Sequence, residues 1–316
     1  MTAVITAVVG DHVLQVSDRR ISAVYQNGRL RPCDDWSNKT VVYCTPTSVV
    51  VMTFTGLAFI HQRGVDEIIA SVLCGQPISV NGFFRTVPGP KHASLWHGID
   101  AVRAELEHLF GGIADLERRG GFTMDIAGFQ RRPDRTWKPV MWRMRLANGK
   151  VSVATLAAFD RPVHSKYEVS FLAGADTPEH RAAVAAELAL DPDGVDVVLR
   201  RAIDRISANN PSVGGQPFVV WIAPESVIRT GAFVDGPDER FAFAFPSDDP
   251  FIVSPWIVTS KYVSPPHLEK IGDGKVSDFL RKYDDSDIDP TVREAALALL
   301  DEAVVLHTPF DRYRPT

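Results

Sequence analysis

The chain has 316 residues, of which 45% are hydrophobic and 23% charged, a composition typical of a globular protein with a substantial core. Its formal net charge of −5 offers no cationic excess for binding nucleic acid or an anionic membrane surface. No apolar run approaches the roughly 18 residues of a membrane span and no signal peptide opens the sequence, so we expect a cytoplasmic protein without a membrane partner.

The first part of the chain is predicted to be strands. Four apolar runs rich in β-branched residues pair into two hairpins, 3–9 with 12–17 around the turn at 10–11, and 39–44 with 48–54 around the breaker at 45–46. The pattern then becomes helical from Gly56 to about Cys74 and again over 93–118.

A similar alternation follows further along the chain. Three strands are predicted at 123–129, 140–146 and 167–173, then helices at 178–190 and 195–208, and a strand at 218–223. Each pair of helices needs a sheet face to cover. The order of elements therefore favours an α+β protein built as a four-layer α-β-β-α sandwich.

The last part of the chain differs in composition. From about residue 231 it is rich in proline and aspartate, with apolar islands at 241–245 and 252–258 and one predicted helix at 290–306. We expect a main domain over 1–230 and a C-terminal extension over 231–316 that packs on this core or on a neighbouring subunit.

The beginning of the chain carries a candidate nucleophile. Thr2 follows Met1 and precedes the small Ala3, a context in which we expect Met1 to be removed. The freed α-amine has an ordinary pKa of about 7.7 to 8.0, so part of it is neutral near pH 7. It can take the proton of the Thr2 hydroxyl, which is a weak nucleophile without a base. Nucleophile and general base would then belong to one residue.

Three further residues fit a site around Thr2. Asp18 ends the second strand of the first hairpin, and antiparallel pairing brings that end beside the start of the first strand. Lys39 opens the next strand, where its ammonium would favour the deprotonated hydroxyl while Asp18 fixes and balances the lysine. Gly56, expected at a strand-to-helix junction, would present a backbone N–H to an oxyanion at the positive end of the helix.

These residues resemble the motifs of the proteasome β-subunit family of N-terminal-nucleophile (Ntn) hydrolases and of its bacterial relatives. The segments concerned are Thr2-Ala3-Val4-Ile5, Ser17-Asp18-Arg19-Arg20, Asn38-Lys39, Thr55-Gly56-Leu57, Ile126-Ala127-Gly128-Phe129 and Ser212-Val213-Gly214-Gly215. The resemblance implies an Ntn fold over about residues 2–230. The predicted first strand starts at Ala3 without a preceding helix, which favours the catalytic branch over the non-catalytic α-type subunits, because those carry a helix ahead of that strand.

The resemblance also implies a function. It implies a threonine-type peptidase or amidase in which Thr2 is the nucleophile, Asp18 and Lys39 form the charge pair and Gly56 donates to the oxyanion. Arg20 would be a structural neighbour of the site, and Ser212 a supporting residue if the motif is shifted by one position. The family implies a homo-oligomeric ring that acts on peptides or unfolded proteins without a cofactor, and leaves a partner ATPase open.

Two segments differ from the family pattern. Ala173-Gly174-Ala175-Asp176 stands where the family has a Gly-Ser-Gly turn, and 210–214 lacks the carboxylate of the usual Asp-x-x-Ser-Gly segment. Two alternatives therefore stay open: a catalytically silent structural or assembly member of the fold, and an Ntn amidase for a small non-peptide substrate.

No metal site is predicted. His92 and His97 are five residues apart, which is not the i,i+4 spacing of a helical metal pair, and the sequence contains no H-E-x-x-H. Its three cysteines, Cys33, Cys44 and Cys74, include no C-x-x-C pair, which favours buried reduced thiols over a disulfide framework.

Overall fold

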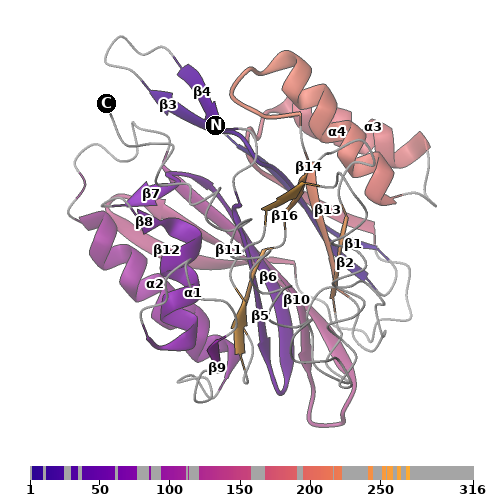
Figure 1. The fold of residues 1–316 in the computed structure, drawn as a ribbon. Helices are drawn as coiled ribbons and strands as arrows, with labels where there is room; N and C mark the ends of the chain where they lie inside the picture. Colours follow the sequence, from indigo (N-terminus) through magenta and orange to yellow (C-terminus); the bar gives the residue numbers. More distant parts are fainter. Residues whose placement is uncertain are drawn as a thin grey trace, which may run out of the picture.

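A computed structural model gives the three-dimensional arrangement of the chain (Figure 1). The residues it describes are 2–9, 12–24, 30–34, 38–60, 63–76, 85–86, 94–111, 113, 121–157, 168–190, 195–215, 217–222, 241–244, 251–253, 255–258, 262–264 and 268–270. None of the helices within these ranges is long and apolar enough to cross a membrane.

Two large sheets form the frame of the molecule. The first has five antiparallel strands in the order β13 (Glu168–Gly174), β1 (Ala3–Val9), β2 (His12–Asp18), β14 (Pro217–Ile222) and β15 (Phe241–Ala244). The second has eight strands in the order β12 (Lys150–Ala157), β11 (Trp137–Ala147), β10 (Phe122–Arg131), β6 (Ser48–Gly56), β5 (Thr40–Thr45), β17 (Trp256–Val258), β18 (Tyr262–Ser264) and β9 (Arg85–Thr86). Within it, only the β5–β17 pair is parallel.

Three two-stranded pairs complete the described strands. They are β3 (Ile21–Val24) with β4 (Leu30–Asp34), β7 (Phe59–Ile60) with β8 (Arg63–Gly64), and β16 (Phe251–Val253) with β19 (Leu268–Lys270).

The helices lie in two pairs on opposite sides of the molecule (Figure 1). The first pair is α1 (Val65–Cys74) and α2 (Leu95–Gly111), whose buried side chains share a core with the eight-stranded sheet. The second pair is α3 (Pro178–Leu190) and α4 (Val195–Asn209), which share a core with the five-stranded sheet.

Strand β6 lies between two hydrophobic cores and is buried on both faces. All eight residues from Ser48 to Thr55 are buried, and their side chains alternate between two cores. Val50, Met52 and Phe54 face the core under α1 and α2, whereas Val49 and Val51 join a core that also holds β2, β14 and β10 side chains. A strand buried on both faces reads as a continuous apolar run, as β6 does.

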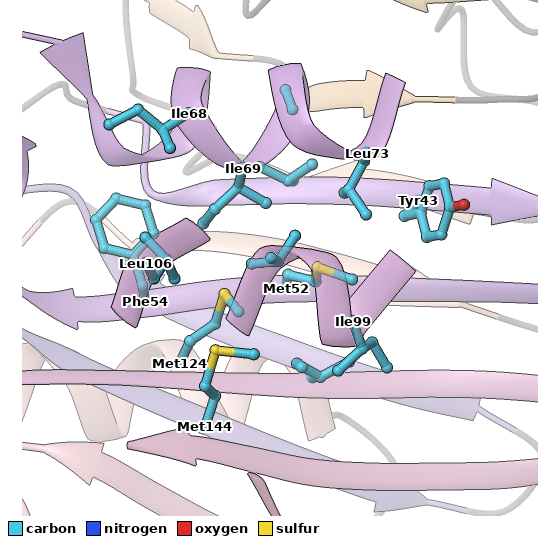
Figure 2. Close-up of a cluster of buried hydrophobic side chains, with 14 of the residues drawn as sticks. Tyr43, Met52, Phe54, Ile68, Ile69, Leu73, Ile99, Leu106, Met124 and Met144 are labelled. Carbon is cyan, nitrogen blue, oxygen red and sulfur yellow. The ribbon is translucent and has the colours of Figure 1, made fainter. Parts of the chain in front are cut away.

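The core beneath α1 and α2 is filled by aliphatic and sulfur-containing side chains (Figure 2). Ile68, Ile69 and Leu73 project from α1 at helical spacing toward side chains of the sheet. Met124 and Met144 lie on the sheet side of the same cluster. Because this packing holds α1 against β5 and β6, it also fixes the strand ends that carry the candidate site.

Several predicted elements agree closely with the structure. The mixed fold with several sheets and few helices is confirmed, and helix 178–190 has the predicted bounds. The predicted helix at 93–118 is described over 95–111. The turn at 10–11 and the helix predicted at 290–306 lie outside the described residues. The division of the chain near residue 230 stays a prediction, although β15 and β17 each add a strand to a large sheet.

The prediction of a helix directly after Gly56 is wrong. Helix α1 begins at Val65, and the intervening residues include the β7–β8 pair. Gly64 is the N-cap residue of α1, and Asp66 and Glu67 occupy its first turn, where acidic side chains favour a helix N-terminus. The apolar residues Phe59 and Ile60 fit a helical period by chance, but they pair as a strand.

Candidate active site

Thr2 lies buried at the start of β1, where its main chain is held from two sides. Its carbonyl oxygen accepts hydrogen bonds from the Ala175 N–H at 3.0 Å and from the Thr55 hydroxyl at 3.2 Å. Only 4% of Thr2 is exposed. The backbone that carries the candidate nucleophile is therefore anchored to the ends of β13 and β6.

Lys39 places its ammonium beside the Thr2 hydroxyl. Its Nζ donates to Thr2 Oγ1 at 2.8 Å, to Asp18 Oδ1 at 3.3 Å and to the Arg20 carbonyl oxygen at 2.6 Å. The residue is only 4% exposed. A buried ammonium is tolerated when its three donors are satisfied and a carboxylate is near, and Lys39 meets both conditions.

Asp18 is the anionic partner and is completely buried. The β1–β2 register pairs Val4 with Ser17, so Asp18 lies beside the first residues of β1. Its Oδ2 accepts from the Ala3 N–H at 2.7 Å, and its Oδ1 accepts from the Arg20 N–H at 2.8 Å and the Gly214 N–H at 3.2 Å. Together with Lys39, these donors hold the carboxylate in one orientation.

Arg20 and Ser212 belong to the surroundings of this pair. The Arg20 guanidinium donates to the carbonyl oxygens of Pro211 at 2.9 Å and Val213 at 3.2 Å, and so ties the turn after α4 to the end of β2. The Ser212 hydroxyl donates to Asn210 Oδ1 at 2.6 Å and is engaged within that turn. From this segment, it is the Gly214 N–H that reaches Asp18.

Gly56 stands at the end of β6, next to Thr55, with a φ of 100°. An added Cβ would lie 2.2 Å from the carbonyl oxygen of Gly121, the residue before β10, so the position requires glycine. Its expected place at a helix N-terminus is wrong because α1 begins at Val65. A role for its N–H in binding an oxyanion stays a prediction, without a contribution from the helix dipole.

Three residues that were not predicted to act in the site touch it. Thr55 donates to the Thr2 carbonyl, Gly214 donates to Asp18, and Gly174 approaches the Thr2 backbone. Gly174 has a φ of 80°, and a Cβ added there would lie 1.8 Å from the Thr2 carbonyl oxygen. The β1–β13 register, which pairs Ala3 with Gly174, makes this approach necessary.

Replacing Gly174 with alanine is therefore expected to lower the free energy of unfolding by about 2 to 5 kcal/mol, which combines left-handed backbone strain with a main-chain clash. Gly149→Ala is the matched control, since Gly149 has a φ of 72° and nothing within 4 Å of an added Cβ. The control substitution is expected to lower the free energy of unfolding by only about 1 to 2 kcal/mol, through backbone strain alone. Equal losses for both variants in urea denaturation would contradict the close approach to Thr2.

The site combines a hydroxyl with a cation and an anion. Within the described ranges, no group of three or more His, Cys, Asp or Glu side chains is placed to hold a metal ion. Lys39 donates to Thr2 Oγ1, so it stabilises negative charge on that oxygen, while Asp18 keeps Lys39 charged and in place. Such a set suits attack by an activated hydroxyl on an electrophilic carbon.

The likeness of this chain to known proteins is weak. The sequence matches no protein-family model, and a search of curated proteins finds no match. Among solved structures, that of eukaryotic HslV from Trypanosoma brucei is similar to this chain with a TM-score of 0.40 and 13% sequence identity. The match covers 70% of this chain and 99% of that one.

Proposed function

We propose that this chain is an N-terminal threonine hydrolase that cleaves amide bonds, with peptides as the expected substrates, through an acyl-enzyme on Thr2. The observation that carries the proposal is the 2.8 Å hydrogen bond from the buried Lys39 ammonium to Thr2 Oγ1, with Asp18 paired to the same ammonium. The Ntn-type α-β-β-α sandwich, the cytoplasmic location and the homo-oligomeric ring belong to the same proposal. The sandwich rests on the order of elements and the motif resemblance, the location on the sequence composition, and the ring on the motif resemblance alone.

The geometry supports an assignment of roles. Lys39 uses all three of its donors on oxygen atoms, so its ammonium cannot also be the base that accepts the threonine proton. Asp18 is occupied by backbone N–H groups and by Lys39. The remaining group with a suitable pKa is the α-amine of Thr2 itself, which exists once Met1 is removed.

The reaction then proceeds in two acyl transfers. Thr2 Oγ1 attacks the amide carbonyl carbon while the α-amine takes the hydroxyl proton, and Lys39 stabilises the charge that develops on Oγ1. The tetrahedral intermediate collapses by breaking the C–N bond, and the protonated α-amine gives its proton to the leaving nitrogen. In the second transfer the α-amine takes a proton from a water molecule whose oxygen attacks the ester carbon. The bond between that carbon and Oγ1 breaks, and the protonated α-amine returns its proton to Oγ1, which releases the acid and restores the Thr2 hydroxyl.

The proposal is tested by comparing Thr2→Val with Thr2→Ser in the processed protein. Valine keeps the β-branched shape but lacks the hydroxyl, whereas serine keeps both hydroxyl and α-amine. With a pool of unstructured peptides analysed by mass spectrometry, we expect Thr2→Val to lower the cleavage rate at least about 10³-fold and Thr2→Ser to stay within about tenfold of the wild type.

A panel of small N-acyl amides, run in parallel, distinguishes the alternatives. Cleavage of small amides without cleavage of peptides would overturn the peptide assignment in favour of a small-substrate amidase. A processed protein that cleaves neither panel would favour a structural or assembly role for the fold.

A further inference from the structure

A second polar cluster lies immediately beside Lys39 and involves Asp66 of α1. The carboxylate Oδ2 of Asp66 accepts hydrogen bonds from Asn38 Nδ2 at 2.8 Å and from Trp256 Nε1 at 3.1 Å. These donors come from the residue before Lys39 and from β17, which lies beside β5 in the eight-stranded sheet. One carboxylate thus joins helix α1, the segment that carries Lys39 and a strand of the C-terminal part of the chain.

Asn38 connects Asp66 to the backbone on the far side of Lys39. Its Nδ2 also donates to the Thr40 carbonyl oxygen at 2.9 Å, and its Oδ1 accepts from the Thr40 N–H at 3.3 Å. The side chain of Asn38 therefore bridges both main-chain groups of Thr40 and encloses Lys39 in a local turn. All donors of the Asn38 amide are used, one toward Asp66 and one toward Thr40.

The charge of Asp66 decides which way the Asn38 amide can face. An ionised carboxylate only accepts hydrogen bonds, so the NH2 group of Asn38 must face it and Oδ1 must face the Thr40 N–H. A protonated carboxyl can donate to Oδ1 instead, which would allow the amide to flip and set its NH2 group against the Thr40 N–H. Two donors would then face each other, and the bridge around Lys39 would be released.

We propose that Asp66 is a positioning residue for the active site, which holds the Lys39 ammonium against Thr2 through Asn38 and releases it when Asp66 is protonated. This inference rests on the proposed function of Thr2 and Lys39, and adds to it a switch outside the catalytic residues. Trp256 would link the switch to the C-terminal part of the chain.

The titration behaviour of Asp66 supports the proposal. Burial raises the pKa of Asp66 from an ordinary value of 3.8 to about 6, while the hydrogen bonds from Asn38 and Trp256 act in the opposite direction. The charge of Glu67 in the same helical turn raises the pKa of Asp66 further, and Glu67 is itself paired with Arg63 at 3.1 Å. As pH rises through about 6, Asp66 ionises, so the bridge forms and Lys39 becomes fixed.

The test is an NMR titration of Lys39, which needs no substrate. In protein with 13Cε-labelled lysine, assigned with Lys39→Arg, we expect the Lys39 ε-methylene signal to shift with a midpoint near 6. This step in the titration curve should disappear in Asp66→Asn. It should also disappear in Asn38→Ala, where Asp66 remains but the bridge is lost. A step that persists in Asn38→Ala would overturn the proposal, because Asp66 would then act on Lys39 through space. The absence of any step in the wild type would overturn it as well.

The rate of Thr2 modification by a β-lactone gives the second measurement. The wild-type rate is expected to rise in two steps, one near pH 6 from Asp66 and one near the pKa of the α-amine at about 7.7 to 8.0. Asp66→Asn should lose the lower step and keep the upper one, with a rate about three- to tenfold lower at pH 7.5. A Lys39 NMR step in a protein that does not react with the β-lactone would refute the proposed hydrolase while leaving the Asp66 linkage intact. A modification rate that rises with pH in a single step, in both the wild type and Asp66→Asn, would refute the link between Asp66 and Lys39 but not the proposed hydrolase.

Discussion

Replacing Lys39 with methionine is expected to lower the rate at which Thr2 reacts with a β-lactone by about 10²- to 10⁴-fold. Methionine keeps most of the length and apolar volume of the lysine side chain but removes the ammonium that lies 2.8 Å from Thr2 Oγ1. The hydroxyl would then lose the hydrogen bond and the positive charge that Lys39 supplies. Because Asp18 keeps three backbone N–H donors in the variant, we expect the fold to be retained.

The matched control for this prediction is Lys150→Met, since Lys150 lies exposed at the start of β12. Thr2 in this control variant should react with the β-lactone at the wild-type rate. The measurement is the pseudo-first-order rate of adduct formation by intact mass. A Lys39→Met rate within about threefold of the wild type would show that the lysine is structural only.

Replacing Asp18 with asparagine is expected to lower the free energy of unfolding by about 3 to 5 kcal/mol, because it leaves the buried Lys39 ammonium without a counter-charge. Oδ1 and Oδ2 together accept four hydrogen bonds from Ala3, Arg20, Lys39 and Gly214. An amide offers one oxygen and one NH2 group, so at least one of these donors would face another donor. The same change should displace the start of β1 and thereby reduce the reactivity of Thr2.

Asp100→Asn is the control for the loss of a carboxylate. Asp100 pairs with Arg103 at 2.8 Å, but its side chain is 55% exposed, so we expect a loss below about 1 kcal/mol. Urea denaturation of both variants checks the difference. Losses of similar size would mean that burial of the Asp18–Lys39 pair does not increase its contribution to the free energy of unfolding.

Much of the fold was predictable because its strands and helices carry strong periodicity. β6 and α3 are long and continuous in sequence pattern, and the structure places them close to the predicted bounds. The strand β12 was missed although a signal was present. Asn148 and Gly149, both with positive φ, form a turn between β11 and β12, and Asn-Gly is a strong hairpin signal.

The elements that could not be predicted depend on distant pairing. The β3–β4 pair contains Pro32 within a short polar run, a feature that argues against a strand in sequence. The parallel pairing of β17 with β5 joins residues about 215 positions apart, for example Trp256 with Val41. No local pattern encodes such a contact.

Some residues of the candidate site could be predicted from the sequence and others could not. Thr2 and Asp18 could be placed together from sequence because β1 and β2 form a hairpin. Lys39 precedes β5 of the other sheet, so its place beside Thr2 could be proposed only from the family resemblance. Gly174 and Gly214 reach the site through β13 and through the turn after α4. Their roles follow from tertiary contacts that the sequence alone does not encode.

The most direct test of the central claim is the intact mass of the protein before and after incubation with a peptide epoxyketone, a reagent that joins both the hydroxyl and the α-amine of an N-terminal threonine. We expect a protein that has lost Met1 and gains a single adduct, located on Thr2 by fragmentation and absent from Thr2→Val. A processed protein with a free Thr2 amine that gains no adduct would contradict the claim that Thr2 is an activated nucleophile.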